Sequence, residues 1–251
     1  MLYGMYVSAA GALANSYRQD VVANNLANAE TVGFKRDLAL FRSRPTQAQE
    51  RGSRQATNGL LERLGGGVFA LPTYTDFTPA SLEETGNPFD VALQGRGFLT
   101  VQGETGLAYT RDGQLALDER HRLVTQSGRR AVLDDRGAAI VLDPDQPFKV
   151  DEAGVVNQAG AVVARLGVVD FADSRALRKQ GASLYVAGNG AGPRPAGAVV
   201  AQGALETSGA APLEELTAMI KAQREFQNNV EALRLQDQML GLAVTRLGSL
   251  T

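Results

Sequence analysis

Helical periodicity at both ends of the chain is the feature that most constrains its fold. One helical pattern begins at Leu2, a second runs from Leu213 to Leu250, and turn-rich, strand-like sequence lies between them. The apolar stripes must be buried on each other, on the middle, or on other copies. Because the middle has its own β pattern, we expect burial on other copies, which favours an assembly protein over an enzyme. Steps of mostly three and four residues define the first pattern: Leu2, Tyr6, Ala9, Leu13, Tyr17, Val21 and Leu26.

Composition excludes several classes of function. The 25 Lys and Arg nearly balance the 27 Asp and Glu, so no strong field favours nucleic acid or an anionic membrane. Cysteine is absent, which removes disulfides, thiolate catalysis and thiolate metal sites. We also expect no cleavable signal peptide, because the apolar start is followed by its first basic residue only at Arg18.

Two glycines interrupt the first helical pattern. Gly4 and Gly11 each cost roughly 1 kcal/mol relative to alanine in a helix interior. Such a cost is easier to understand if another backbone approaches closely at these positions. An amphipathic helix packed on its own core remains the alternative.

A cluster of asparagines predicts where this helix ends. Asn24, Asn25 and Asn28 lie close together before Gly33, and asparagine and glycine tolerate the left-handed conformation that terminates helices. Asparagine side chains also compete for backbone hydrogen bonds. Phe34 follows as an apolar anchor, directly before the cationic pair Lys35 and Arg36.

The segment 42–67 is poor in large apolar residues, and we expect an extended or mobile connection ending in a bend at 65–67. Its arginines have no aromatic residues between them, so nucleic-acid binding is not expected. Regular short strands then indicate an antiparallel meander or a distorted barrel. The expected strands are 98–101, 107–110, 114–117, 122–125, 138–142, 148–150, 154–156, 161–163, 166–171 and 183–187.

The last helical pattern carries a heptad seam. Pro212 suits a first helical turn, and Glu214 and Glu215 suit the positive end of the helix dipole. Asp237 interrupts the seam, and we interpret it as a residue that fixes register or faces a charged partner. The seam consists of Phe226, Val230, Leu233, Leu240, Val244 and Leu247.

No constellation predicts catalysis or a metal site. His121 is the only histidine, and its acidic and basic neighbours indicate a solvated turn between strands. The acidic turns at 134–135 and 143–145 lack the spacing of a calcium loop. The glycine-rich segment 188–192 is followed by prolines where a dinucleotide site needs a helix. The carboxylates of Asp112, Asp118 and Glu119 lie in predicted turns, where acidic residues are common.

Several segments resemble the signature sequences of flagellar rod, hook and hook-associated proteins. They follow the family's order and span nearly the whole chain. A hook protein would carry extra β domains, so the length is most similar to the short rod proteins, the proximal side first and the distal rod next. The similar segments are Ser8–Gly11, Asn24–Asn28, Thr31–Arg36, Gly86–Phe98, Tyr109–Gly113, Leu123–Gly128, Leu205–Ser208 and Glu214–Phe226.

The resemblance implies an α+β protein with paired long terminal helices in a coiled coil and a central antiparallel β domain. Residues 1–34 and 211–251 would form the helical core, 35–80 a link, and 81–210 the outer β domain. It also implies export as an unfolded chain by the flagellar type III apparatus. Helical assembly with itself and other axial proteins in the periplasmic basal-body rod would follow, without cofactor, nucleic acid or small-molecule substrate. The termini would order only on assembly.

Candidate residues for subunit contacts follow from the helical stripes and from the resemblance, which also implies that Phe34 points into a neighbouring layer of the assembly. Two rival classes stay open at this point: an extracellular β-rich hydrolase, and a coiled-coil adhesin or oligomer that folds its termini without an export apparatus. The candidates are Leu13, Val21, Asn24, Asn25, Leu26, Asn28, Gly33, Phe34, Lys35, Phe226, Val230, Leu233, Leu240, Val244 and Leu247.

Overall fold

The structure, a computed structural model, describes residues 2–45, 66–104, 106–188 and 190–248. It divides into two compact units, which we name the helical unit and the β unit. The helical unit contains 1–27, 37–74 and 212–251, and the β unit contains 28–36 and 75–211. The expected link 35–80 is thus shared between the two units. The expected α+β class, with a helix at each end and an antiparallel β region between, is confirmed.

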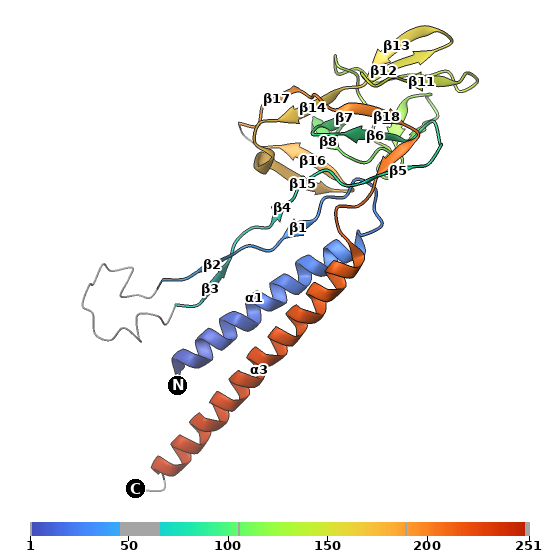
Figure 1. Cartoon of the computed structure of the whole chain (residues 1–251). Coiled ribbons are helices and arrows are strands. Elements are labelled where there is room, and N and C mark those ends of the chain that lie inside the picture. The colour runs from blue at the N-terminus through green and yellow to red at the C-terminus, as the bar shows by residue number, and fades with distance from the viewer. Residues whose placement is uncertain (1, 46–65, 105, 189, 249–251) are drawn as a thin grey trace. The chain divides into compact units, whose positions relative to one another are not determined.

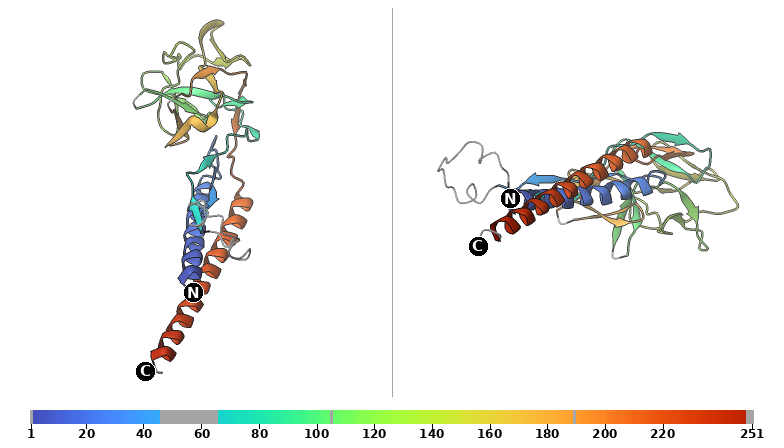
Figure 2. Two further views of the ribbon diagram at one scale, coloured as in Figure 1. Left: turned by 90° about the vertical axis from the view of Figure 1, so that its left-hand side faces the viewer. Right: turned by 90° about the horizontal axis from the view of Figure 1, so that it is seen from below.

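Two long helices lie side by side in the helical unit. Helix α1 spans Leu2–Ala27 and helix α3 spans Pro212–Gly248. They run antiparallel, and the end of α3 extends past the start of α1 (Figures 1 and 2). Pro212 and the acidic pair Glu214–Glu215 form the first turn of α3, as expected from the helix dipole. Neither helix is long and apolar enough, in its described part, to cross a membrane.

The helices bury part of their stripes on each other within one chain, whereas we expected burial on other copies. Ala222 is fully buried, and Met219, Phe226, Leu233 and Leu240 are half-buried. A large apolar surface remains on both helices. The large apolar side chains still exposed on them are Tyr3, Tyr6, Val7, Leu13, Leu213, Leu216, Ile220, Leu235, Met239, Leu242 and Val244.

A β ribbon packs along α1 where an extended connection was expected. Its strands are β1 (Asp37–Leu38), β2 (Phe41–Ser43), β3 (Val68–Ala70) and β4 (Tyr74–Thr75). Strands β2 and β3 are antiparallel. The Tyr17 ring meets the Phe41 ring edge-on at 6.2 Å, and its hydroxyl donates to the Leu71 carbonyl at 3.2 Å. These contacts make the described parts of the connection a component of the helical unit, whereas 46–65 lie outside the described residues.

The β unit contains small antiparallel sheets around a six-stranded one. The six-stranded order is β15-β16-β8-β7-β14-β17, and further pairs are β9–β10, β5–β19, β6–β18 and the triple β11-β12-β13. Strands distant in sequence are therefore neighbours, which contradicts the meander, one of the two arrangements that we expected. The strands are β5 (Leu82–Glu84), β6 (Val91–Gln94), β7 (Phe98–Gln102), β8 (Leu107–Thr110), β9 (Leu115–Leu117), β10 (Leu123–Thr125), β11 (Phe148–Val150), β12 (Val155–Gln158), β13 (Ala161–Arg165), β14 (Val168–Phe171), β15 (Leu177–Gly181), β16 (Leu184–Ala187), β17 (Pro193–Pro195), β18 (Val199–Gln202) and β19 (Ala204–Glu206), with a 3₁₀ turn η1 (Ser174–Ala176).

Most of the expected strands are present. The strand expected at 138–142 is wrong, because those residues make only isolated bridges such as Arg122 with Val141. The main core is aliphatic and includes Val101, Leu123, Val132 and Val156, each at most 1% exposed. A second cluster is aromatic and stacks Phe98, Tyr109, Phe171 and Tyr185 edge-on.

Truncation of Leu123 to alanine should destabilise the β unit by about 2–5 kcal/mol, because the side chain is 1% exposed and leaves a cavity in the aliphatic core. Val162, which is 69% exposed on β13, provides the control: Val162→Ala should leave the free energy of unfolding nearly unchanged. Chemical denaturation of the full chain measures both, and equal losses would contradict this core assignment.

Candidate assembly site

A buried cluster of three charges lies inside the β unit. The Lys35 Nζ is 2.6 Å from Glu206 Oε1, and the Arg111 Nη1 is 2.9 Å from Glu206 Oε2. All three side chains are at most 2% exposed. We name these residues the charge cluster. Buried charges of this kind persist only when they are paired and hydrogen-bonded, so the three segments that carry them must meet.

Backbone groups satisfy most of the remaining hydrogen-bonding capacity of the charge cluster. Lys35 Nζ also donates to the Thr78 carbonyl at 2.8 Å, and the Ala80 amide donates to Glu206 Oε1 at 2.8 Å. Arg111 donates to the carbonyls of Leu93 and Gly95 at 3.1 and 2.6 Å. Desolvation lowers the pKa of the Lys35 ammonium, and the Glu206 carboxylate beside it acts in the opposite direction.

Gly33 and Phe34 lie in the same interior. Gly33 adopts a left-handed φ of 63°, and its amide donates to the Glu206 carbonyl at 2.9 Å. A methyl group at Gly33 would collide with the Arg111 carbonyl. Phe34 is 6% exposed, with the Lys179 Nζ 4.3 Å from the centre of its ring. The structure therefore places Phe34 in the β unit of its own chain, whereas we expected it to point into a neighbouring layer.

The asparagine cluster ends α1, as expected. Asn25 is 2% exposed, and its amide group donates to the Asp37 carbonyl at 2.8 Å and accepts from the Asp37 amide at 2.9 Å. In the β unit, the Asn28 carbonyl accepts from the Thr31 amide and from the Ser208 hydroxyl. Asn24, by contrast, is exposed. The cluster therefore closes the reversal of the chain after the helix.

The candidate residues on the helices divide into two groups. Val21 is buried, and Leu26, Phe226, Val230, Leu233 and Leu240 are half-buried within the helical unit. Leu13 and Val244 are 73% and 69% exposed. The side chain of Leu247 lies outside the described residues. The structure thus leaves part of the expected contact surface free and uses the rest within the chain.

The acidic and histidine side chains serve local structure. His121 is exposed in its turn, as expected, and Glu119 is exposed beside it. Asp118 Oδ1 accepts from the backbone amides of Arg120 and Arg122 at 2.9 and 2.8 Å, and these bonds lower the pKa of its carboxyl. Among the described residues, no group of three or more His, Asp or Glu side chains is placed to hold a metal.

Asp112 accepts local hydrogen bonds, as expected of an acidic residue in a turn, but it is also buried. It is 3% exposed, and burial raises the pKa of its carboxyl against the donors Ser127 and Gln114. The Ser127 hydroxyl donates to Asp112 Oδ2 at 2.6 Å. In the segment 188–192, residue 189 lies outside the description, and the strand β17 follows where a dinucleotide site would need a helix.

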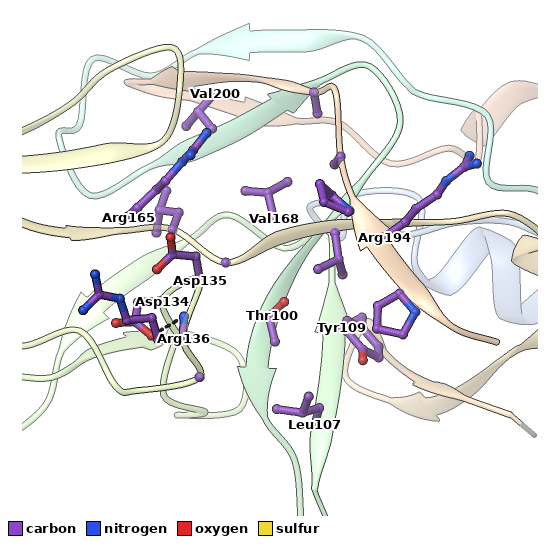
Figure 3. A pocket seen from close by; sticks show the side chains of 18 of the residues that line it. Thr100, Leu107, Tyr109, Asp134, Asp135, Arg136, Arg165, Val168, Arg194 and Val200 are labelled. Carbon is purple, nitrogen blue, oxygen red and sulfur yellow. Dashed lines mark hydrogen bonds between the residues drawn. The ribbon is translucent and has the colours of Figure 1, made fainter. Parts of the chain in front are cut away.

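A hollow of about 600 Å³ opens beside β14 and β17 (Figure 3). Arg136, Arg165 and Arg194 line it around an apolar floor that includes Val168. Local contacts engage two of its three arginines: Arg194 pairs with Asp170 at 2.7 Å, and Arg165 Nε donates to the Ala153 carbonyl at 3.1 Å. Its size suits a small ligand, but these two arginines contribute to the fold.

The helices with exposed apolar stripes favour a structural protein built for assembly. Comparison with family profiles agrees with this class. Residues 5–35 match the profile "Flagella basal body rod protein", 92–164 match "Flagellar hook protein FlgE/F/G D1 domain", and 201–246 match "Flagellar basal body rod FlgEFG protein C-terminal".

Curated relatives extend the similarity over nearly the whole chain. It is 34% identical over 233 residues to the flagellar basal-body rod protein FlgF of Caulobacter vibrioides, which covers 92% of both chains. FlgF of Mesorhizobium japonicum is 31% identical, covering 98% of both. FlgG of Bacillus subtilis is 33% identical, covering 96% of this chain and 97% of the relative. The chain therefore belongs to the flagellar basal-body rod protein family, structural subunits of the basal-body rod.

Each of the three matched segments contributes one member of the charge cluster. Lys35 ends the first segment, Arg111 lies in the second, and Glu206 lies in the third. Sequence reasoning placed Lys35 at a subunit contact and gave no role to Arg111 or Glu206. The available signal was that Arg111 and Glu206 are charged residues at the ends of short apolar strands.

Removal of the central charge should destabilise the β unit by roughly 3–5 kcal/mol, because Glu206→Gln leaves two buried cations without their carboxylate. Glu104→Gln is the matched control, since the Glu104 side chain is 64% exposed in its pair with Arg130. Thermal and chemical denaturation measure both variants. A loss for Glu206→Gln no larger than for the control would contradict the role of the charge cluster.

Loss of the Asn25 amide should cost about 1–3 kcal/mol, because Asn25→Ala leaves both backbone groups of Asp37 without their partner. Asn228→Ala, at an exposed position of α3, is the control and should have little effect. The measurement is the free energy of unfolding of the full chain. Equal values for the two variants would contradict the role of Asn25 in holding the Asp37 backbone.

Proposed function

We propose that this chain is a rod subunit whose terminal helices form a coiled coil and bind the helices of neighbouring axial subunits, with the β unit outside. The observation that carries the proposal is the exposed apolar surface of both helices in a chain whose β unit has its own core. Monomeric proteins rarely expose such stripes, and contiguous apolar surface marks interaction sites. Leu13, Val244 and Leu247 would lie at subunit contacts.

Neighbouring subunits would repeat the same contact along the axis. Contacts between unlike surfaces that do not close on themselves generate an open helical filament, which is the form of a growing tube. The buried residue Val21 and the half-buried residues Leu26, Phe226, Val230, Leu233 and Leu240 would hold the helix pair together within each subunit. Phe34 and Lys35 would support assembly indirectly, by fixing the interior of the β unit.

Export through the flagellar type III apparatus as an unfolded chain is the second part of the proposal. The absence of cysteine supports it, since no disulfide can form in transit. The helices expose much of their apolar surface in the single chain, so they would gain most of their stability after export, on assembly.

The relatives named FlgF favour a proximal position in the rod, and the similarity to FlgG keeps the distal rod as the alternative. An autonomous oligomer is the competing reading of the exposed stripes. It would pack its helices in the free protein and need no other axial subunit.

Double truncation of the seam should prevent normal rod formation. Phe226→Ala with Leu240→Ala removes two half-buried side chains of α3, which cost about 2–5 kcal/mol each where assembly buries them fully. Glu231→Ala with Gln238→Ala, at exposed positions, is the control. Electron microscopy of isolated basal bodies and motility measure the effect, and normal rods in the seam variant would contradict the proposal.

Limited proteolysis of the dilute full chain, with fragments identified by mass spectrometry, tests the assembly-dependent folding directly. We expect a resistant core near residues 80–205 and rapid loss of both ends. Resistance of the complete chain would mean that the helices already pack stably in the free protein, which favours the autonomous oligomer.

A further inference from the structure

The apolar contacts of the helix pair repeat every seven residues. Met219, Phe226, Leu233 and Leu240 are half-buried and spaced by one heptad. Sliding α3 along α1 by seven residues, about 10.5 Å at 1.5 Å per residue, would bring an equivalent apolar side chain to each place. The apolar side chains therefore do not distinguish one register from the next.

Polar and small residues face each other between the same helices. A β-carbon at Gly4 would lie 2.9 Å from Gln236 Nε2, and one at Gly11 would lie 2.9 Å from Asn229 Oδ1. These glycines thus make room for amide side chains, whereas we expected the close approach of a backbone. At the other end, Asn25 Nδ2 is 3.4 Å from Glu215 Oε2.

These contacts keep one constant register. The step of seven from Gly4 to Gly11 matches the step of seven from Gln236 back to Asn229. The step of fourteen from Gly11 to Asn25 likewise matches the step from Asn229 back to Glu215. Between them, the Arg18 Nη1 is 2.9 Å from Glu225 Oε2. We name these eight residues, Gly4, Gly11, Arg18, Asn25, Glu215, Glu225, Asn229 and Gln236, the polar seam.

The charged members distinguish the native register from its neighbours. The residues seven positions before and after Glu225 are Ala218 and Ala232, so a slide in either direction leaves Arg18 opposite alanine. The residue seven positions after Glu215 is Ala222, which would face Asn25. A shifted register therefore loses the ion pair and the Asn25 bond while it keeps the apolar contacts.

One member of the seam is present despite its cost. Gln236 Oε1 is buried without a hydrogen-bond partner, and such an acceptor destabilises the pair relative to an apolar side chain. Polar residues at the interface of coiled coils specify register at a cost in stability. We propose that the polar seam selects the antiparallel register of the helix pair, and thereby sets which part of α3 extends past α1.

Cysteine pairs test the register in a chain that has no cysteine of its own. Ser8 lies four residues after Gly4, and Ala232 lies four residues before Gln236, so these two half-buried residues are opposite each other in the native register. Ser8 and Met239 would be opposite each other only after a shift of one heptad. Ser8→Cys with Ala232→Cys should cross-link within one chain on oxidation. Ser8→Cys with Met239→Cys should not. The reaction is carried out in isolated basal bodies and, where limited proteolysis shows that both ends of the free chain are protected, in the purified full chain.

Removal of the selecting groups should release the register. Arg18→Ala, Asn25→Ala and Glu225→Ala together should raise the ratio of the shifted to the native cross-link by about tenfold, which corresponds to ~1.4 kcal/mol. Glu231→Ala with Arg234→Ala is the control, because this exposed pair lies within α3 and should leave the ratio unchanged.

Three outcomes would overturn the proposal. They are shifted cross-links in a chain whose polar seam is unaltered, native cross-links alone after the three seam substitutions, or cross-links only between chains. Incorporation of the chain into basal bodies is scored separately on the same samples. A chain that cross-links in the native register but is absent from basal bodies would refute the rod assignment and leave the register assignment intact.

Discussion

The charge cluster of Lys35, Arg111 and Glu206 is the interaction on which the β unit depends. Each charge is removed from water, and loss of Glu206 would leave both cations buried without a counter-ion. The cluster therefore requires three segments from the start, middle and end of the sequence to meet in one interior. Helix α1 ends immediately before Asn28 and α3 begins immediately after Ala211, so the two segments joined by the cluster are those that carry the helices.

In the helix pair, the apolar residues stabilise the packing and the polar residues select the register. In the assembly that we propose, the exposed apolar surface of the helices binds neighbouring subunits, while the apolar residues between them repeat by heptads and stabilise any register. The polar seam is the part that differs from one heptad to the next. A rod subunit needs both, because its contacts with neighbours are useful only if every copy presents the same length of α3.

The sequence was sufficient for the features that depend on local pattern. The ends of α1, the start of α3 and most strands follow from periodicity, Asn25 and Pro212. It was insufficient where the partner is distant in sequence: Glu206 has no local signal that it meets Lys35, and strand pairs such as β6 with β18 bridge most of the β unit. Phe34 was placed at a subunit contact because the local sequence does not distinguish an apolar residue buried in its own chain from one exposed for a partner. Gly4 and Gly11 were expected to admit another backbone, whereas the groups nearest them are the side-chain amides of Gln236 and Asn229 on α3.

Hydrogen exchange of individual backbone amides in the full chain tests the central role of the charge cluster most directly. The Gly33 amide, which donates to Glu206, and the Leu123 and Val132 amides of the core are the reporters. If the cluster holds the β unit together, Gly33 should open with the same free energy as the core amides, by global unfolding. Exchange of Gly33 at a much lower free energy, with the core still protected, would show that the core stands without the cluster and would contradict the account.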